Sequence, residues 1–122
     1  MILVDTSIWA DHFRAADSSL SALLERGMVL LHPFVLGELA LGNLADWDGT
    51  VGALGRLPRP VLAGSEDVLS LIKRESLMGT GLGWVDATLL ASARLTPDSR
   101  LWTRDVRLAA AAQRLGIGLP EH

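Results

Sequence analysis

Four acidic residues of this chain stand where an ionised carboxylate is costly unless a partner charge or a cation compensates it. Asp5 directly follows the apolar run of residues 2–4, and Glu38 interrupts an apolar helical segment. Asp86 opens the most apolar helical segment of the chain, and Asp105 follows a short strand-like run. Taken singly, Asp86 and Asp105 are typical of helix-start acids, which stabilise a helix by roughly 0.3–1 kcal/mol each. Taken together, the four carboxylates would repel one another without a cation among them.

A set of oxygen ligands selects a hard divalent ion, here Mg²⁺ or Mn²⁺. The chain has no cysteine, its three histidines are scattered, and no hydrolytic triad can be assembled around Ser7. Carboxylate clusters that hold such ions hydrolyse phosphodiesters, because the ions activate water and neutralise the charge that develops on the phosphate. The sequence therefore predicts that Asp5, Glu38 and Asp86 lie within one coordination sphere, with Asp105 as a fourth acid.

Short apolar runs predict the strands that would position these acids. Residues 2–4 (Ile-Leu-Val) are typical of a central parallel strand that is buried on both faces. Residues 28–31 and 100–103 predict two further strands, and residues 117–119 predict a final edge strand. Because ligands bind at the carboxyl ends of parallel strands, we expect the acids that follow these strands to gather at one edge of the sheet.

Helices are predicted between the strands. Asp17 and Ser18 are suitable N-caps, and Gly27 is a suitable terminator, for a helix through residues 20–24. The other expected helices cover residues 8–13, 34–44, a short part of 46–55, 65 to about 79, 87–95, and 105–115. Alternating strands and helices predict an α/β fold, with a small parallel sheet flanked by helices. A chain of 122 residues is long enough for one domain, expected to span residues 1–122.

The net negative charge of the chain is compatible with a nucleic-acid ligand only if the charged side chains are unevenly distributed. The net charge is −3, but setting aside the four candidate site acids leaves +1 on the rest of the chain. Ten of the eleven basic residues are arginine, which binds phosphate in a bidentate manner. A GC-rich genome would produce the same arginine bias. Arg104 and Arg107 flank Asp105, and they fit phosphate contacts and a solvated face equally well.

The composition also limits the compartment and the surroundings of the protein. No apolar run reaches the roughly 20 residues that span a bilayer, so no membrane partner is expected. The absence of cysteine and of an export signal predicts a cytoplasmic protein. With 49% hydrophobic residues and a mean hydropathy of +0.32, part of the surface is expected to be covered by a partner.

Four segments together resemble a known family. They are Asp5-Thr6-Ser7 after the Ile-Leu-Val run, Glu38 in its apolar helix, the Gly-Trp-Val-Asp-Ala segment of residues 83–87, and the Leu-Trp-Thr-Arg-Asp segment of residues 101–105. In this order and at this chain length they resemble the PIN domain, and more narrowly the VapC toxins of VapBC toxin–antitoxin modules. The resemblance covers essentially the whole chain, and residues 102–105 are its most specific part.

The resemblance implies a divalent-metal-dependent endoribonuclease with a parallel sheet flanked by helices, acting as the toxin of a type II toxin–antitoxin system. It implies an RNA substrate, hydrolysis by a metal-activated water, Mg²⁺ or Mn²⁺ as cofactor, homodimerisation, possible higher toxin–antitoxin assembly, and a cognate antitoxin that lies across the active-site groove. Carried over by position, it implies metal-site roles for Asp5, Glu38, Asp86 and Asp105, with Asp105 acting directly or through water, and site-lining roles for Thr6, Ser7 and Thr103.

Two other functions fit these residues less well. A receiver-like phosphate-accepting domain needs a paired acid beside the first strand and a lysine after a late strand. Here Ser7 stands two residues after Asp5, and Lys73 lies inside a predicted helix. A non-catalytic PIN-like RNA- or protein-binding module would normally have lost one or more of the four acids, and this chain retains all of them.

Overall fold

β1 (Ile2–Val4) is the middle strand of a three-stranded parallel sheet in the computed structural model of the chain, which describes residues 1–120. It pairs with β2 (Val29–Leu30) on one side and with β3 (Arg100–Trp102) on the other. Leu3 stands opposite both Leu30 and Leu101. Leu3 and Val4 are fully buried, as the unbroken apolar run requires. The predicted central parallel strand is therefore confirmed.

The predicted edge strand at residues 117–119 is wrong in extent. This segment adds only an isolated parallel bridge between Leu101 and Gly118. Its position is nevertheless fixed, because the Leu101 N–H donates to the Ile117 carbonyl at 2.7 Å. Pro120 follows directly and has no backbone N–H to continue a ladder, so the segment ends before it becomes a strand.

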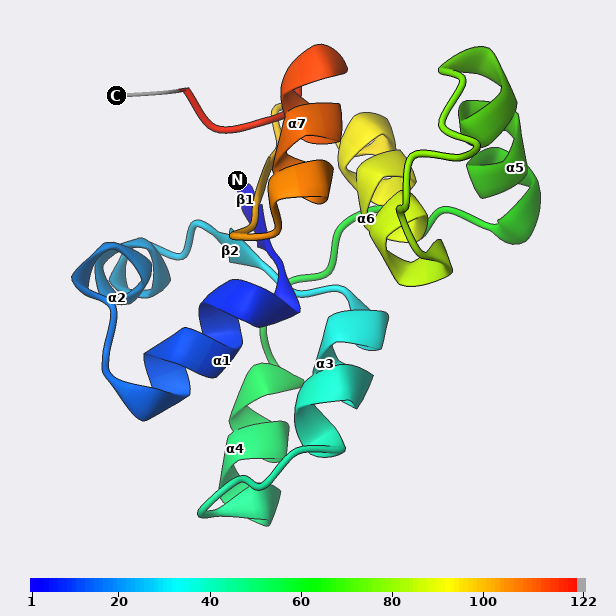
Figure 1. Cartoon of the computed structure of the whole chain (residues 1–122). Coiled ribbons are helices and arrows are strands. Elements are labelled where there is room, and N and C mark those ends of the chain that lie inside the picture. The colour runs from blue at the N-terminus through cyan, green and yellow to red at the C-terminus, as the bar shows by residue number, and fades with distance from the viewer. Residues whose placement is uncertain (121–122) are drawn as a thin grey trace.

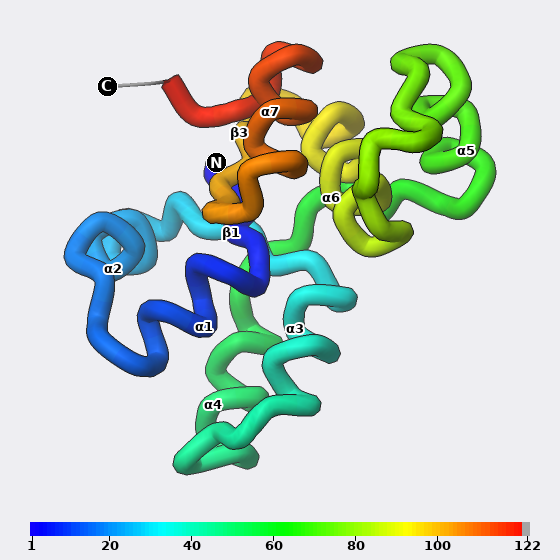
Figure 2. Tube along the Cα trace, in the orientation of Figure 1, coloured from blue at the N-terminus to red at the C-terminus, as the bar shows by residue number. Residues whose placement is uncertain are grey.

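Seven helices surround the sheet within residues 1–120. They are α1 (Thr6–Arg14), α2 (Ser18–Glu25), α3 (Pro33–Ala40), α4 (Trp47–Leu54), α5 (Ser65–Arg74), α6 (Trp84–Leu95) and α7 (Val106–Arg114). α6 and α7 pack against β3, α1 packs on α3, α3 on α4, and α5 on α6. Figures 1 and 2 show the α3–α4 pair and the α5–α6 pair projecting from the sheet in different directions. The predicted α/β class with a small parallel sheet is confirmed.

Three helix boundaries differ from the prediction. α3 ends at Ala40 rather than at residue 44, just before Gly42 and Asn43, which are both poor helix formers. α5 ends at Arg74 rather than near residue 79, because Ser76 takes a φ of 52° in the left-handed region. α6 begins at Trp84, three residues earlier than predicted, since the carboxylate of Asp86 accepts the N–H of Gly83.

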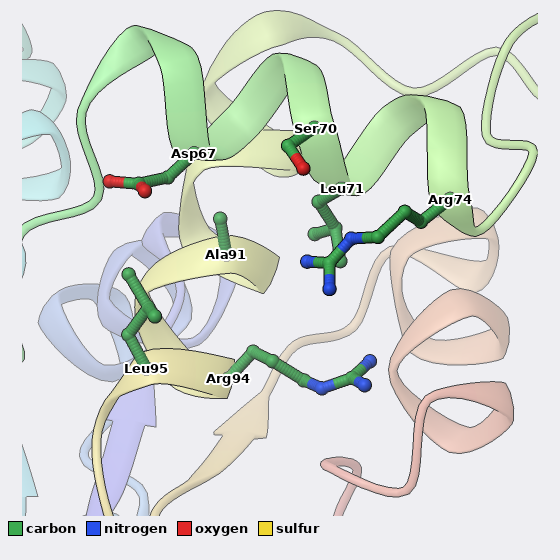
Figure 3. Close-up of a pocket in the computed structure, with 7 residues that line it drawn as sticks. All are labelled: Asp67, Ser70, Leu71, Arg74, Ala91, Arg94 and Leu95. Atoms are coloured by element: carbon green, nitrogen blue, oxygen red, sulfur yellow. The ribbon is translucent and has the colours of Figure 1, made fainter.

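The seam between α5 and α6 encloses a small cavity of about 70 Å³ (Figure 3). Buried Leu71 and Ala91 lie on its inner side, and the side chains of Arg74 and Arg94 extend past it. None of the four candidate site acids lines this cavity. The seam is therefore packing between two helices, at a distance from the predicted chemistry. Among residues 1–120, no helix combines the length and the apolar character needed to cross a membrane.

Candidate active site

Asp5 lies at the carboxyl end of β1 and is 7% exposed. Its backbone N–H donates to the Trp102 carbonyl at 2.9 Å, which joins the ends of β1 and β3. Although Asp5 occupies the N-cap position of α1, its carboxylate makes no capping bond to that helix. The carboxylate is instead held by two hydroxyls, from Thr103 at 2.6 Å and from Ser7 at 3.1 Å. Asp5 is therefore oriented by contacts between segments that are distant in the sequence.

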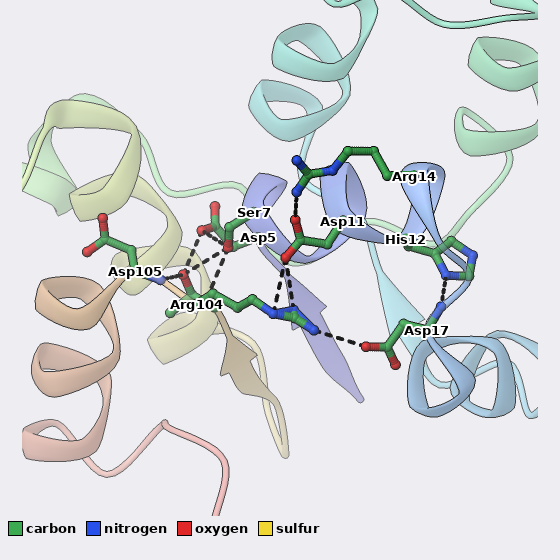
Figure 4. A network of polar contacts seen from close by, with 9 residues as sticks. Asp5, Ser7, Asp11, His12, Arg14, Asp17, Arg104 and Asp105 are labelled. Carbon is green, nitrogen blue, oxygen red and sulfur yellow. Dashed lines mark hydrogen bonds and ion pairs between the residues drawn. The ribbon is translucent and has the colours of Figure 1, made fainter.

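The two hydroxyls connect Asp5 to the segment that follows β3 (Figure 4). Thr103 Oγ1 accepts the Asp105 N–H at 3.0 Å, and Ser7 Oγ accepts the Arg104 N–H at 3.0 Å. Each hydroxyl has one proton, and each gives it to Asp5 Oδ2. Both hydroxyls therefore bind the same carboxylate oxygen, Asp5 Oδ2. Asp5 Oδ1 has no hydrogen bond within the described residues.

Asp86 and Asp105 each lie at the start of a helix. Asp105 is the N-cap of α7, where its Oδ1 accepts the Leu108 N–H at 2.9 Å. Asp86 stands in the first turn of α6, where its Oδ2 accepts the Gly83 N–H at 3.3 Å. The helix-start interpretation of both residues is thus confirmed, and each keeps a second carboxylate oxygen. The positive ends of the two helices favour negative charge at these positions.

Glu38 reaches the site from α3. Its Oε1 accepts a hydrogen bond from Thr6 Oγ1 at 2.8 Å, which connects the middle of α3 to the first residue of α1. The Glu38 side chain is exposed, although its helix neighbours Val35 and Leu39 are buried. Packing of α1 on α3 therefore turns the one polar position of an apolar segment toward the end of β1.

The four acids act on one another electrostatically. Burial raises the pKa of Asp86, while the hydrogen bond from Gly83 lowers it. The negative charges of Asp5, Asp105 and Glu38 raise the pKa of Asp86 further. This mutual effect shows that residues far apart in the sequence have been brought to the same end of the domain. We call these four residues the acidic site.

The prediction that Asp5, Glu38 and Asp86 share one coordination sphere stays a prediction. Within residues 1–120, no three acidic or histidine side chains stand close enough to hold a metal ion as they are arranged. The reason is local, because each carboxylate accepts hydrogen bonds from donors of its own. The donor set itself, four carboxylates with hydroxyls beside them, fits Mg²⁺ or Mn²⁺ in chemical type.

Arg104 does not extend freely toward a ligand. Of the two interpretations from the sequence, a phosphate contact and a solvated face, its pairing with two aspartates favours the solvated face. Its guanidinium pairs with Asp11 at 3.2 Å and with Asp17 at 3.0 Å (Figure 4). The hydrogen bond from the Leu20 N–H lowers the pKa of Asp17, burial opposes this effect, and the hydrogen bond and charge of Arg104 lower the pKa further. The sequence analysis missed this role of Asp11 and Asp17. One signal was present, because Asp11 lies one helical turn after Ser7 and therefore on the same face of α1.

Comparison with known proteins supports the resemblance. No family model matches the chain. Two curated relatives, from two strains of Mycobacterium tuberculosis, are each named Ribonuclease VapC32. Each is 46% identical to this chain over 121 residues, which cover 99% of this chain and 98% of the relative. At this identity over nearly the full length of both proteins, the chain belongs to the VapC ribonuclease family.

Proposed function

We propose that the protein is a divalent-metal-dependent endoribonuclease, the cytoplasmic toxin of a type II toxin–antitoxin system. The observation that carries this proposal is the acidic site, where burial and then the charges of Asp5, Asp105 and Glu38 raise the pKa of Asp86. Such repulsion is unfavourable in the free protein and is relieved when a cation binds. The ribonuclease name of the two relatives supports RNA as the substrate.

Asp5, Glu38, Asp86 and Asp105 would hold Mg²⁺ or Mn²⁺ through their carboxylates. A bound divalent ion supplies charge neutralisation and a nucleophilic water at neutral pH. Asp5 is the anchor of the set, because buried β1 behind it and the hydroxyls of Ser7 and Thr103 beside it fix its position. Thr6 has the same function for Glu38, which it holds at the rim of the site.

An antitoxin and a second copy of the chain are the proposed protein partners. A cavity of about 280 Å³ between α1 and α3 supports an antitoxin site beside the acidic site, since Glu38 and Thr6 line it together with the half-exposed Phe13. Leu41, at the end of α3, is 90% exposed. An exposed aliphatic side chain beside such a cavity is typical of a surface that a protein segment covers.

The test is cleavage of a panel of structured RNAs by the parent protein and by Asp5→Asn. Asparagine keeps the shape of the side chain and removes the charge that would hold the cation. Cleavage should require Mg²⁺ or Mn²⁺, stop in EDTA, and be lost in Asp5→Asn and in Asp86→Asn, whereas Asp105→Asn should be milder. Thermal melts are the control, because the Asn variants should remain folded and match or exceed the parent once repulsion is relieved. Undiminished cleavage in EDTA or in Asp5→Asn would refute the proposal.

A further inference from the structure

A second cavity, of about 310 Å³, lies between α7 and the loop that joins α5 to α6. Arg107 and Arg114 of α7 line one side, the hydroxyl residues Ser76 and Thr80 line the loop side, and Leu77 and Leu82 contribute apolar wall. We call it the arginine cavity. No acidic residue lines it, although the net charge of the chain is −3.

Neither arginine of this cavity forms an ion pair with an acid of residues 1–120. Arg107 makes no ion pair or hydrogen bond with any of residues 1–120, in contrast to Arg104, which is paired with two aspartates. Arg114 donates to the backbone carbonyl of Glu75 at 2.8 Å, but this acceptor is uncharged. The Glu75 carboxylate is itself paired with Arg94 at 3.3 Å. Two guanidinium groups therefore retain donors for an anion.

The arginine cavity adjoins the acidic site. Arg107 follows Asp105 by two residues, and its guanidinium lies over Gly81, where an added Cβ would stand 2.5 Å from Nη1. Gly81 precedes by two residues the N-cap Gly83, whose N–H binds Asp86. Arg107 is thus held between the starts of the two helices that carry acids. Arg114 stands two helical turns further along α7, about 10 Å away on the same face.

We infer that the arginine cavity binds a phosphate of the RNA next to the bond cleaved at the acidic site, with the adjoining nucleoside against the leucine wall. The inference rests on the proposed function. Guanidinium groups bind phosphate oxygens through charge-assisted, bidentate hydrogen bonds. The Ser76 hydroxyl adds a further donor, whereas the Thr80 hydroxyl already donates to the Leu77 carbonyl at 2.6 Å. Where the RNA strand runs out of the acidic site, its phosphates carry negative charge, and binding them needs positive charge on the protein just beyond the four carboxylates. The cavity supplies that charge where the paired Arg104 does not.

The experiment measures binding of a short fluorescent single-stranded RNA by anisotropy, across a range of NaCl concentrations. It uses the Asp5→Asn background in Mg²⁺ and again in EDTA, and a gel of each sample records whether the RNA stays intact. The Arg107→Gln/Arg114→Gln variant should bind more weakly at low salt. The slope of log Kd against log salt should fall by about 0.7 for each phosphate that the variant no longer neutralises. Arg107→Lys/Arg114→Lys should keep most of the slope, because the charges remain.

Arg26→Gln/Arg74→Gln is the matched control. It removes the same charge from exposed arginines outside the cavity, so its slope should stay close to that of the background. An equal change in this control, an unchanged slope in Arg107→Gln/Arg114→Gln, or no RNA binding by the background would overturn the inference. Normal RNA binding with loss of an antitoxin complex would also overturn it, in favour of a protein ligand. Cut RNA on the gel would instead refute the role of Asp5, and so separates failure of the proposed function from failure of the inference.

Discussion

Asp5 differs from the other acids in what holds its carboxylate. Asp86 and Asp105 are held by backbone N–H groups of their own helices, so their positions follow from local sequence. Asp5 depends on Ser7 and on Thr103, which is 98 residues away in the chain. The orientation of this one carboxylate therefore reports on whether β1 and β3 are correctly joined.

Thr103→Val tests this network at the scale of one residue. Valine keeps the shape of the side chain but removes the hydroxyl, which leaves Asp5 Oδ2 with one donor and the Asp105 N–H without its acceptor. The free energy of unfolding should fall by about 1–3 kcal/mol, the range for losing a hydrogen bond to a charged or buried group. Urea denaturation measures this change, and Thr103→Ser is the control that should stay near the parent. Equal stability of the Val and Ser variants would show that the network does not stabilise the fold.

At the scale of elements, α3 is the helix that presents Glu38, and its start depends on an unusual cap. His32 is 3% exposed, and its Nδ1 accepts the Phe34 N–H at 2.9 Å. Because Nδ1 accepts, the ring is neutral with its proton on Nε2, which is buried and has no partner within residues 1–120. Burial lowers the pKa of His32, and the charge of Arg59 lowers it further. Protonation would both bury a charge and destroy the cap.

This cap predicts a pH dependence of stability. The folded-state pKa of His32 lies below the ordinary value of 6.5, so the unfolded chain takes up the proton first. The contribution of His32 should be complete above about pH 6.5 and should decline as the pH falls below that value. His32→Asn, which keeps an acceptor at the N-cap, should flatten this part of the profile even if its overall stability is lower. Urea denaturation between pH 7 and pH 5 measures the slopes, and parallel profiles would contradict the prediction.

The elements that the sequence predicted well are those with strong local signals. Residues 2–4 and 101–102 are short apolar runs, and Asp17 and Asp105 are N-caps that the structure confirms. The segment at 117–119 was predicted as a full strand because its apolar pattern does not show that it pairs with β3 at a single bridge, Leu101 to Gly118. The position of Asp11 on the same face of α1 as Ser7 was the one local signal for its pairing with Arg104, and neither the Asp17 pair nor the separation of Arg107 from Arg104 has a local signal. Both depend on how the loop after β3 crosses the start of α1.

At the scale of the whole molecule, the two ends of α6 have different surroundings. Asp86 in its first turn belongs to the acidic site, and Leu95 at its last residue is 44% exposed, about 14 Å further along the helix. The Val61 N–H donates to Thr96 Oγ1 at 2.8 Å, which places Val61 and Leu62 beside Leu95. All three aliphatic side chains are nearly half exposed. A partner bound there would leave the acidic site open, which suits a second copy of the chain better than an antitoxin.

We therefore expect a homodimer that uses the surface of Val61, Leu62 and Leu95. Sedimentation velocity of the isolated protein at micromolar concentration should give twice the mass of one chain. Leu62→Glu should shift the protein toward the monomer. It places a negative charge in the buried apolar contact, where two-fold symmetry brings it close to the same charge of the second copy. Leu41→Glu is the matched control, since Leu41 is also exposed but stands at the end of α3, so its dimer should persist while antitoxin binding weakens. A monomeric parent, or equal dimerisation of the Leu62→Glu variant, would rule out this surface as the dimer contact.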